Sequence, residues 1–332
     1  MSPPKKILVT CATGNQGRGV VQHCLAAGHT VFAYVRDPTT AAAAQLAQRG
    51  AILVQGDLGD LDALRAATRG MDAVFLTEVK TRDAAGDLQR SINVIVAAQA
   101  AVTVSHLIVA TAITTGQHGS FPWWAEADSL TQPHPMREYW LNKHALETRV
   151  REAAESASDP SGGNTIRHWT ILRPGHFLQN LLQPISSFVF PGLAEDRALR
   201  VGWRPETQIP WVDAGDVGMV AAAAVADPER YSHRAIDLAV EALTVQEVAA
   251  RIGRALALRG TEAASVQVQV QCRSESELDE MIRAGDRVAA SHQWANGVRG
   301  GDVVGRSREE LGALAGELNS VDAFLAAHAE RI

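Results

Sequence analysis

The chain has 332 residues, of which 46% are hydrophobic and 20% are charged, and its formal net charge is −6. This composition supports a folded protein with a full core, and the interspersed charges offer no basic surface for nucleic acid or for a membrane, so we expect a small-molecule partner. Three widely spaced cysteines (Cys11, Cys24 and Cys272) form neither a disulfide framework nor a zinc pattern, and no apolar run approaches the roughly 18 residues of a membrane span, so we expect a cytoplasmic protein without a bound metal.

Apolar runs and helical patterns alternate through the first half of the chain. After the first apolar run, apolar residues recur at helical spacing until Gly28 ends that helix. The pattern predicts strands at 7–10, 30–35, 52–55, 73–77, 106–111 and 169–172, and helices at 41–49, 87–101 and 137–156, with another that ends near residue 68. Alternation at this spacing predicts an α/β fold with a Rossmann-like, doubly wound parallel sheet.

The periodicity weakens beyond residue 175. We therefore expect a dinucleotide-binding domain at 1–175, with sheet contributions continuing to about 240, and a smaller, mainly substrate-binding α/β lobe at 176–332. Thr244 and Glu247 have the spacing of a capping box that starts a helix, and Asp213 and Asp216 could cap another. Further strands are expected at 234–238 and 265–271, and further helices at 217–226, 275–283, 306–318 and 321–330.

The stretch from Lys6 to Val20 passes from an apolar strand into a loop of small residues and then into a helix. Gly14 and Gly17 occupy the last two glycine positions of a G-x-G-x-x-G pattern, and Ala12 occupies the first. Backbone amides of such a loop can approach a pyrophosphate, to which the helix presents its positive end. The alternative is a plain strand-to-helix turn. The expected cofactor contacts here are Thr10, Cys11, Thr13, Gly14, Asn15, Gln16 and Gly17.

Arg36 lies after the second predicted strand, about 20 residues beyond the glycine loop, where its charge would complement a 2′-phosphate. It favours NADP(H), although Asp37 is adjacent and a solvent-exposed arginine is the simpler alternative. Asp57 and Leu58 could lie beneath the adenine or form an ordinary turn and helix cap. Thr77 and Pro174, at the ends of the fourth and sixth strands, complete the expected cofactor contacts together with Lys143.

Tyr139 and Lys143 are four residues apart and so share one face of a predicted helix. A nearby ammonium favours phenolate over phenol, so the tyrosine could give a proton to a carbonyl oxygen while the lysine also holds the nicotinamide ribose. Thr111 is placed to steady the developing oxyanion, with Thr114 as the fallback, although threonine at a strand end is ordinary β-structure.

Candidate substrate contacts come from two segments. The long loop between Thr111 and Met136 carries Trp123 and Trp124, and it is either a lid over a pocket or a surface crossover with its tryptophans turned inward. His176 and Phe177 follow the sixth strand. His176 could shuttle protons or shape the pocket, or it could be a histidine bonded to the backbone.

These motifs resemble the NmrA-like group of atypical short-chain dehydrogenases/reductases, well up to about residue 240 and weakly beyond it. The resemblance rests on residues 9–17, 54–58, 139–143, 171–180 and 209–218. It implies a Rossmann domain and a small C-terminal lobe with NADP(H) in the cleft between them. Three positions depart from the family pattern, which has glycine at Cys11, serine at Thr111 and often an apolar residue at His176.

The resemblance implies two classes of function, because such proteins are either reductases of small organic compounds or redox sensors that regulate a protein partner. Our first hypothesis is an NADPH-dependent reductase of a small hydrophobic, aromatic or polyketide-like carbonyl compound. Our second is a non-catalytic NADP(H)-binding sensor. A homodimer is compatible with both. The Tyr139 and Lys143 pair favours the enzyme, because a sensor has no need of a tuned phenol.

Overall fold

The fold is that of a computed structural model, which describes residues 3–81, 83–124, 133–156, 165–258, 266–312 and 317–332. A turn-rich stretch of the sequence at 158–164 lies outside these residues, as does part of the loop that precedes Met136.

A seven-stranded parallel sheet forms the centre of the molecule. Its strands lie in the order β10-β6-β5-β4-β1-β2-β3, and every neighbouring pair is parallel. The strands are β1 (Lys6–Val9), β2 (Thr30–Val35), β3 (Ile52–Gln55), β4 (Ala73–Thr77), β5 (His106–Ala110), β6 (His168–Pro174) and β10 (Arg234–Leu238). This order confirms the predicted doubly wound sheet, which changes direction between β1 and β4.

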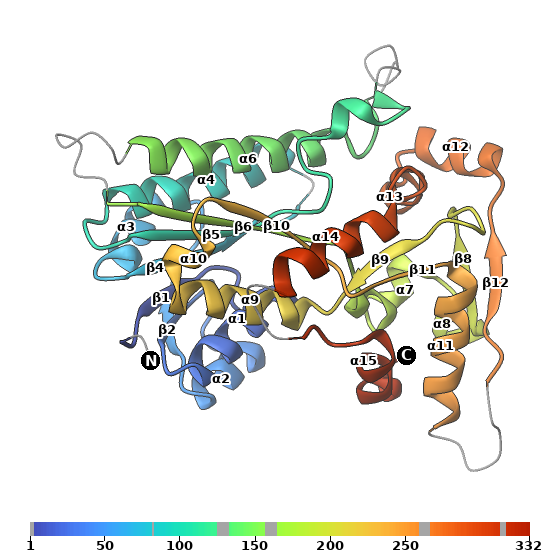
Figure 1. The fold of residues 1–332 in the computed structure, drawn as a ribbon, viewed down its shortest axis with the longest axis horizontal. Helices are drawn as coiled ribbons and strands as arrows, with labels where there is room; N and C mark the ends of the chain where they lie inside the picture. The colour runs from blue at the N-terminus through green and yellow to red at the C-terminus, as the bar shows by residue number, and fades with distance from the viewer. Residues whose placement is uncertain (1–2, 82, 125–132, 157–164, 259–265, 313–316) are drawn as a thin grey trace.

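Helices cover both faces of this sheet (Figure 1). One face carries α1 (Asn15–Ala26), α2 (Ala41–Gln48) and α9 (Ala214–Ala226), and the other carries α3 (Leu61–Thr68), α4 (Ala84–Ala100) and α6 (Arg137–Glu155). Successive strand residues point to opposite faces, so Ile7 and Val9 are buried in the first core and Leu8 in the second. The result is a three-layer α/β/α sandwich.

Parallel pairing also brings the carboxyl ends of the strands to one edge of the sheet. The segments after Val9, Thr77, Ala110 and Pro174 therefore start side by side, although they are far apart in the sequence. This edge is where open α/β sheets bind their ligands.

The remaining elements form a second region beyond this edge, on the right of Figure 1. It holds a three-stranded sheet, β11-β9-β7, and a two-stranded sheet, β12-β8. Their strands are β7 (His176–Phe177), β8 (Ala198–Val201), β9 (Ile209–Val212), β11 (Glu241–Leu243) and β12 (Gln269–Cys272). Apart from α10 (Pro228–Tyr231), which packs against β6 and α9 of the central sandwich (Figure 1), the helices are α7 (Ser186–Val189), α8 (Leu193–Asp196), α11 (Val245–Ala257), α12 (Glu275–Arg283), α13 (Arg287–Ala295), α14 (Gly300–Gly312) and α15 (Val321–Ala327). None of the helices in the described ranges is both long and apolar enough for a membrane crossing.

Sequence patterns located some of these elements and misplaced others. The capping box of Thr244 and Glu247 is confirmed, and β10 and α12 have the predicted bounds. Helix α13 was not predicted, and the helix expected at 306–318 instead begins at Gly300 and ends at Gly312. A Cβ on Gly300 would lie 2.1 Å from the Gln208 carbonyl oxygen, so this glycine serves close packing rather than a break in the helix.

Helices α1 and α9 pack with their backbones in direct contact. A Cβ on Gly218 would lie 2.1 Å from the carbonyl carbon of Gly19, and a Cβ on Gly19 would lie 2.9 Å from the Cα of Gly215. Side chains at these positions would force the two helices apart. The contact therefore depends on glycine.

Gly218→Ala should lower the free energy of unfolding by about 3 kcal/mol, because the added methyl group overpacks a backbone contact. Urea denaturation measures this change. Gly305→Ala is the matched control, since Gly305 also lies in a helix and a Cβ there meets no atom within 4 Å. It should be neutral or slightly stabilising. Equal effects of the two substitutions would contradict the packing argument.

Asp213 and Asp216 join the start of α9 to the C-terminal segment. Asp213 accepts a hydrogen bond from the Gly215 N–H at 2.7 Å and so caps the helix as predicted. Asp216 lies inside the first turn and does not cap it; instead it accepts from the Asn319 N–H at 2.9 Å. Burial, with a contribution from Asp213, raises the pKa of Asp216 to about 7.

Asp216→Asn should stabilise the protein more at pH 8 than at pH 5. The pKa of Asp216 is higher in the folded chain than its ordinary value of 3.8, so ionisation of Asp216 opposes folding increasingly as the pH rises to about 7. The asparagine does not ionise, and its advantage should be about 2 kcal/mol greater at pH 8. Urea denaturation at both pH values tests this, with the exposed Asp302→Asn as control. A pH-independent difference would contradict it.

Candidate active site

A cavity of about 500 Å³ opens at the carboxyl edge of the sheet. Among the predicted cofactor and catalytic residues, it is lined by Gln16, Thr77, Thr111, Tyr139, Lys143 and Pro174. The predicted substrate residues His176 and Phe177 line it as well. Residues separated by more than 150 positions in the sequence thus border one space, because the parallel strands deliver them to one edge.

The glycine loop between β1 and α1 leaves the helix N-terminus open. Gly14 is the N-cap residue, and no side chain accepts a hydrogen bond from the first amides of α1. A Cβ on Gly17 would lie 2.3 Å from the Cys11 carbonyl oxygen, so the tight loop requires this glycine. Gln16 donates to the Thr77 hydroxyl at 3.3 Å, while its buried Oε1 has no partner. Uncapped amides and a free buried oxygen fit a bound dinucleotide.

Cys11 adopts a left-handed backbone conformation, with φ of 49°. Glycine adopts this conformation without cost, which explains why the family pattern has glycine here. The Cys11 thiol lies 3.5 Å from the Thr77 carbonyl oxygen, and burial raises its pKa to about 11 despite the nearby charges of Arg36 and Lys143. Cys11 therefore packs in the loop as a neutral thiol. Two other loop residues make local contacts, since Thr10 donates to the Phe75 carbonyl and Asn15 accepts from Arg18.

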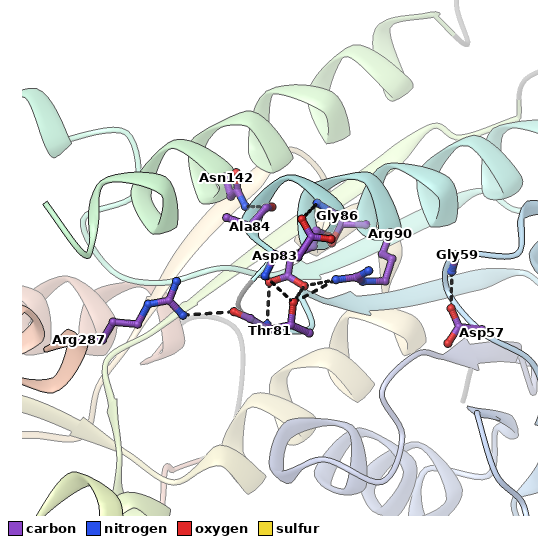
Figure 2. Close-up of polar contacts among 11 residues, drawn as sticks. Asp57, Gly59, Thr81, Asp83, Ala84, Gly86, Arg90, Asn142 and Arg287 are labelled. Carbon is purple, nitrogen blue, oxygen red and sulfur yellow. Dashed lines mark hydrogen bonds and ion pairs between the residues drawn. The ribbon is translucent and has the colours of Figure 1, made fainter. Parts of the chain in front are cut away.

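The residues expected around the adenosine end lie at the ends of β2 and β3. Arg36 is exposed, whereas Asp37 accepts bonds from the backbone N–H and the hydroxyl of Thr39, which lower its pKa. Asp37 is thus occupied in a local turn, and Arg36 stays available to a phosphate. Asp57 accepts from the Gly59 N–H at 2.7 Å (Figure 2), and Leu58 is buried.

Tyr139 and Lys143 both face the cavity from α6, but Lys143 has a partner that the sequence did not indicate. Its ammonium lies 3.1 Å from the Glu78 carboxylate, and the two side chains are only 5% and 3% exposed. The Tyr139 hydroxyl has no hydrogen-bond partner in the described part of the chain. The Lys80 ammonium lies over the Tyr139 ring, 3.0 Å from its centroid.

The Thr111 hydroxyl has a partner that the sequence did not indicate. Thr111 lines the cavity, and its hydroxyl donates to the Glu147 carboxylate at 2.8 Å. Glu147 is buried and also accepts from Arg173 at 2.8 and 2.5 Å and from Arg151 at 3.0 Å. Thr111 therefore belongs to a buried network that ties β5 to α6 and β6. The fallback, Thr114, accepts from the Trp294 indole at 3.2 Å.

The segment after β4 lines the cavity, and Figure 2 shows its polar contacts. The Thr81 N–H and hydroxyl donate to Asp87 at 2.7 and 2.9 Å, and Asp87 is also paired with Arg90. Arg287, at the start of α13, donates to the Thr81 carbonyl at 3.2 Å. This bond joins the Rossmann part of the chain to the C-terminal region between two residues that line the cavity.

Aromatic side chains form part of the cavity wall. His176 stacks on Trp294 with an interplanar angle of 17°, and Trp203, Phe190 and His292 line the wall beside them. Burial lowers the pKa of His176 to about 4 and that of His292 to about 3, so both rings are neutral at pH 7. The aromatic part of the cavity wall is therefore uncharged and suits a planar apolar group.

The tryptophans expected to contact substrate lie elsewhere. Trp123 is 8% exposed and stacks on His134, while Trp124 packs beside it against the same apolar core. Neither lines the 500 Å³ cavity, and this placement corresponds to the second alternative, a crossover with its tryptophans turned inward. Residues 125–132 of this loop lie outside the described ranges.

Sequence reasoning missed several residues of the site. Glu78 and Lys80 follow directly after a buried strand, and charges at that position could have indicated the cavity. Trp203, His292 and Trp294 had no such signal, because they come from weakly patterned segments that only the tertiary structure brings together. In the described ranges, no group of histidine, cysteine or carboxylate side chains is arranged to hold a metal ion.

The sheet order, the open N-terminus of α1 and the cavity at the carboxyl edge define a Rossmann-type dinucleotide-binding architecture. A model of the NmrA-like family matches residues 3–297. The chain therefore belongs to the NmrA-like family.

Similar proteins include both reductases and a regulator. An NAD(P)H azoreductase of Xenophilus azovorans is 30% identical over 75% of this chain and 73% of its own length. The nitrogen metabolite repression protein nmrA of Emericella nidulans is 26% identical over 87% of this chain and 76% of its own length. The structure of a Citrobacter sp. triphenylmethane reductase complexed with NADP(H) superposes with a TM-score of 0.68 at 20% identity, covering 98% of this chain and 99% of that one.

Proposed function

We propose that the protein is an NADPH-dependent reductase of a small hydrophobic carbonyl compound, with an aromatic or polyketide-like body. The observation that carries this proposal is the lining of the cavity, which combines Tyr139 and two lysines with neutral aromatic rings. A sensor needs the cofactor loop alone. The cavity extends beyond that loop to Tyr139 and the aromatic rings, and this part of it suits a substrate.

The cofactor would extend along the carboxyl edge of the sheet. The amides at the start of α1 would receive the pyrophosphate, Arg36 the 2′-phosphate, and the β4 and β6 ends at Thr77 and Pro174 would border the nicotinamide. Bound NADPH supplies a hydride for the substrate carbon. Residues 1–175 would thus hold the cofactor, while the lobe at 176–332 supplies most of the aromatic wall.

Tyr139 would hold the proton that the substrate oxygen receives. Its hydroxyl faces the cavity without a competing partner in the described ranges, which leaves its hydrogen available. Lys143 is fixed by Glu78 and would bind hydroxyl groups of the cofactor ribose with its remaining hydrogens. The buried network of Glu147 would keep α6, and so Tyr139, at a fixed distance from the end of β5.

The aromatic part of the cavity wall supports the proposed substrate class. His176, Trp203 and Trp294 would stack on a flat apolar body. The reductases similar to this chain act, by their names, on azo compounds and triphenylmethane dyes, which are likewise aromatic. A small hydrophilic sugar would not match this wall.

Arg36→Met should weaken NADPH binding by about tenfold or more and leave NADH binding nearly unchanged. The reason is that a charged hydrogen bond to the 2′-phosphate contributes about 1.5–3 kcal/mol, and NADH lacks this phosphate. Isothermal titration calorimetry with both cofactors measures the change. Arg65→Met, on the surface of α3, is the control. Equal weakening for both cofactors would contradict the assignment.

Tyr139→Phe should lower kcat for an aromatic ketone or quinone by about 100-fold, because proton transfer by a positioned acid contributes at least this much. Oxidation of NADPH, followed with a panel of such compounds, provides the assay. The Kd for NADPH should stay unchanged, which separates loss of the acid from loss of the cofactor. A variant that reduces the same substrate as fast as the parent would rule out Tyr139 as the acid.

A further inference from the structure

Two lysines approach Tyr139, and their surroundings differ. The Lys143 ammonium lies 5.7 Å from the centroid of the Tyr139 ring and forms a buried ion pair with Glu78. The Lys80 ammonium lies 3.0 Å from the same centroid. Within the described ranges, no carboxylate forms an ion pair with Lys80. Among the described residues, Lys80 is therefore the lysine nearest the Tyr139 ring that forms no ion pair.

The backbone next to Lys80 is anchored by its neighbour in the chain. Thr81 binds Asp87 in α4 through its N–H and hydroxyl, and it accepts from Arg287 of α13 through its carbonyl. Figure 2 shows Thr81 between Arg287 on one side and Arg90 on the other. Anchoring Thr81 from both sides fixes the backbone position from which the Lys80 side chain extends over the ring.

Resting on the function proposed above, we propose that Lys80 is a positioning residue whose ammonium stabilises the phenolate form of Tyr139 across the face of its ring. During proton transfer, the O–H bond of Tyr139 breaks, its electron pair stays on the phenolate, and the proton forms the new O–H bond of the product. Solvent returns a proton to the phenolate afterwards. The negative charge is spread over the ring, which is where the ammonium lies.

The sequence pattern assigned this task to Lys143. Glu78 offsets the charge of Lys143. Lys143 is also farther than Lys80 from the Tyr139 ring, so the effect of Lys143 on the Tyr139 phenol is reduced. Burial and the charge of Lys143 lower the pKa of Lys80, while Glu78 raises it. Lys80 is nevertheless exposed to solvent where it lines the cavity, which limits this lowering. A phenolate under Lys80 would raise the pKa of Lys80 in turn, because the coupling is reciprocal.

Titration of the tyrosines tests this inference on the full chain without cofactor or substrate. The chain has three tyrosines, and burial raises the pKa of Tyr34 to about 12 and also raises that of Tyr231. The near-ultraviolet absorbance of phenolate should therefore reveal Tyr139 as the first to ionise. Tyr139→Phe identifies this step by removing it.

Lys80→Met should raise the midpoint of the Tyr139 step by about one pH unit, because it removes an adjacent opposite charge. Lys80→Arg should keep the midpoint near that of the parent chain, and Lys143→Met should shift it less than Lys80→Met does. Lys6→Met is the matched control, since Lys6 is an exposed lysine at the opposite end of β1, and it should have no effect.

Three results would overturn the inference. They are an unchanged midpoint in Lys80→Met, an equal shift in Lys80→Arg, and a larger shift in Lys143→Met. Because the titration needs no turnover, a chain that oxidises no NADPH with any compound would contradict the proposed reductase and would leave this readout intact. The two failures are therefore distinguishable.

Discussion

The contact between α1 and α9 is the constraint on which the rest of the structure depends. Gly19, Gly215 and Gly218 bring the two backbones together without intervening side chains. α1 begins at the glycine loop. α9 is capped by Asp213 and carries Asp216 in its first turn, and both carboxylates bind the C-terminal segment. One close packing of helices thus fixes the open helix N-terminus and, on the same side of the sheet, the attachment of the second region.

Burial of charge organises the site itself. Glu78, Lys143 and Glu147 are nearly inaccessible, and each has a partner of opposite charge, which offsets the cost of removing it from water. Pairing also assigns functions: Lys143 and Glu147 are held in fixed positions, whereas Tyr139 and Lys80 face the open cavity. The groups available for chemistry are therefore those that take no part in an ion pair in the described part of the chain, namely Tyr139 and Lys80.

The family relationship and the cavity constrain function in different ways. Membership in the NmrA-like family gives the dinucleotide-binding fold, but similar proteins include an azoreductase and a nitrogen metabolite repression protein. Fold therefore does not separate catalysis from regulation. The aromatic wall and the phenol are features of this chain's own side chains, and for that reason they carry the proposed function.

The sequence by itself determined the parallel sheet, most strand bounds, the glycine loop and the shared face of Tyr139 and Lys143, because these follow from local periodicity and spacing. Periodicity could not predict the hydrogen bond between Thr111 and Glu147 or the ion pair between Lys143 and Glu78. In each pair the two residues lie on different segments of the chain. It could not foresee that Gly300 opens a helix, because the reason is the nearby Gln208 carbonyl. The aromatic wall of His176, Trp203 and Trp294 was likewise decided by tertiary structure alone: packing brings together segments whose own patterns are weak, and only that packing defines the cavity.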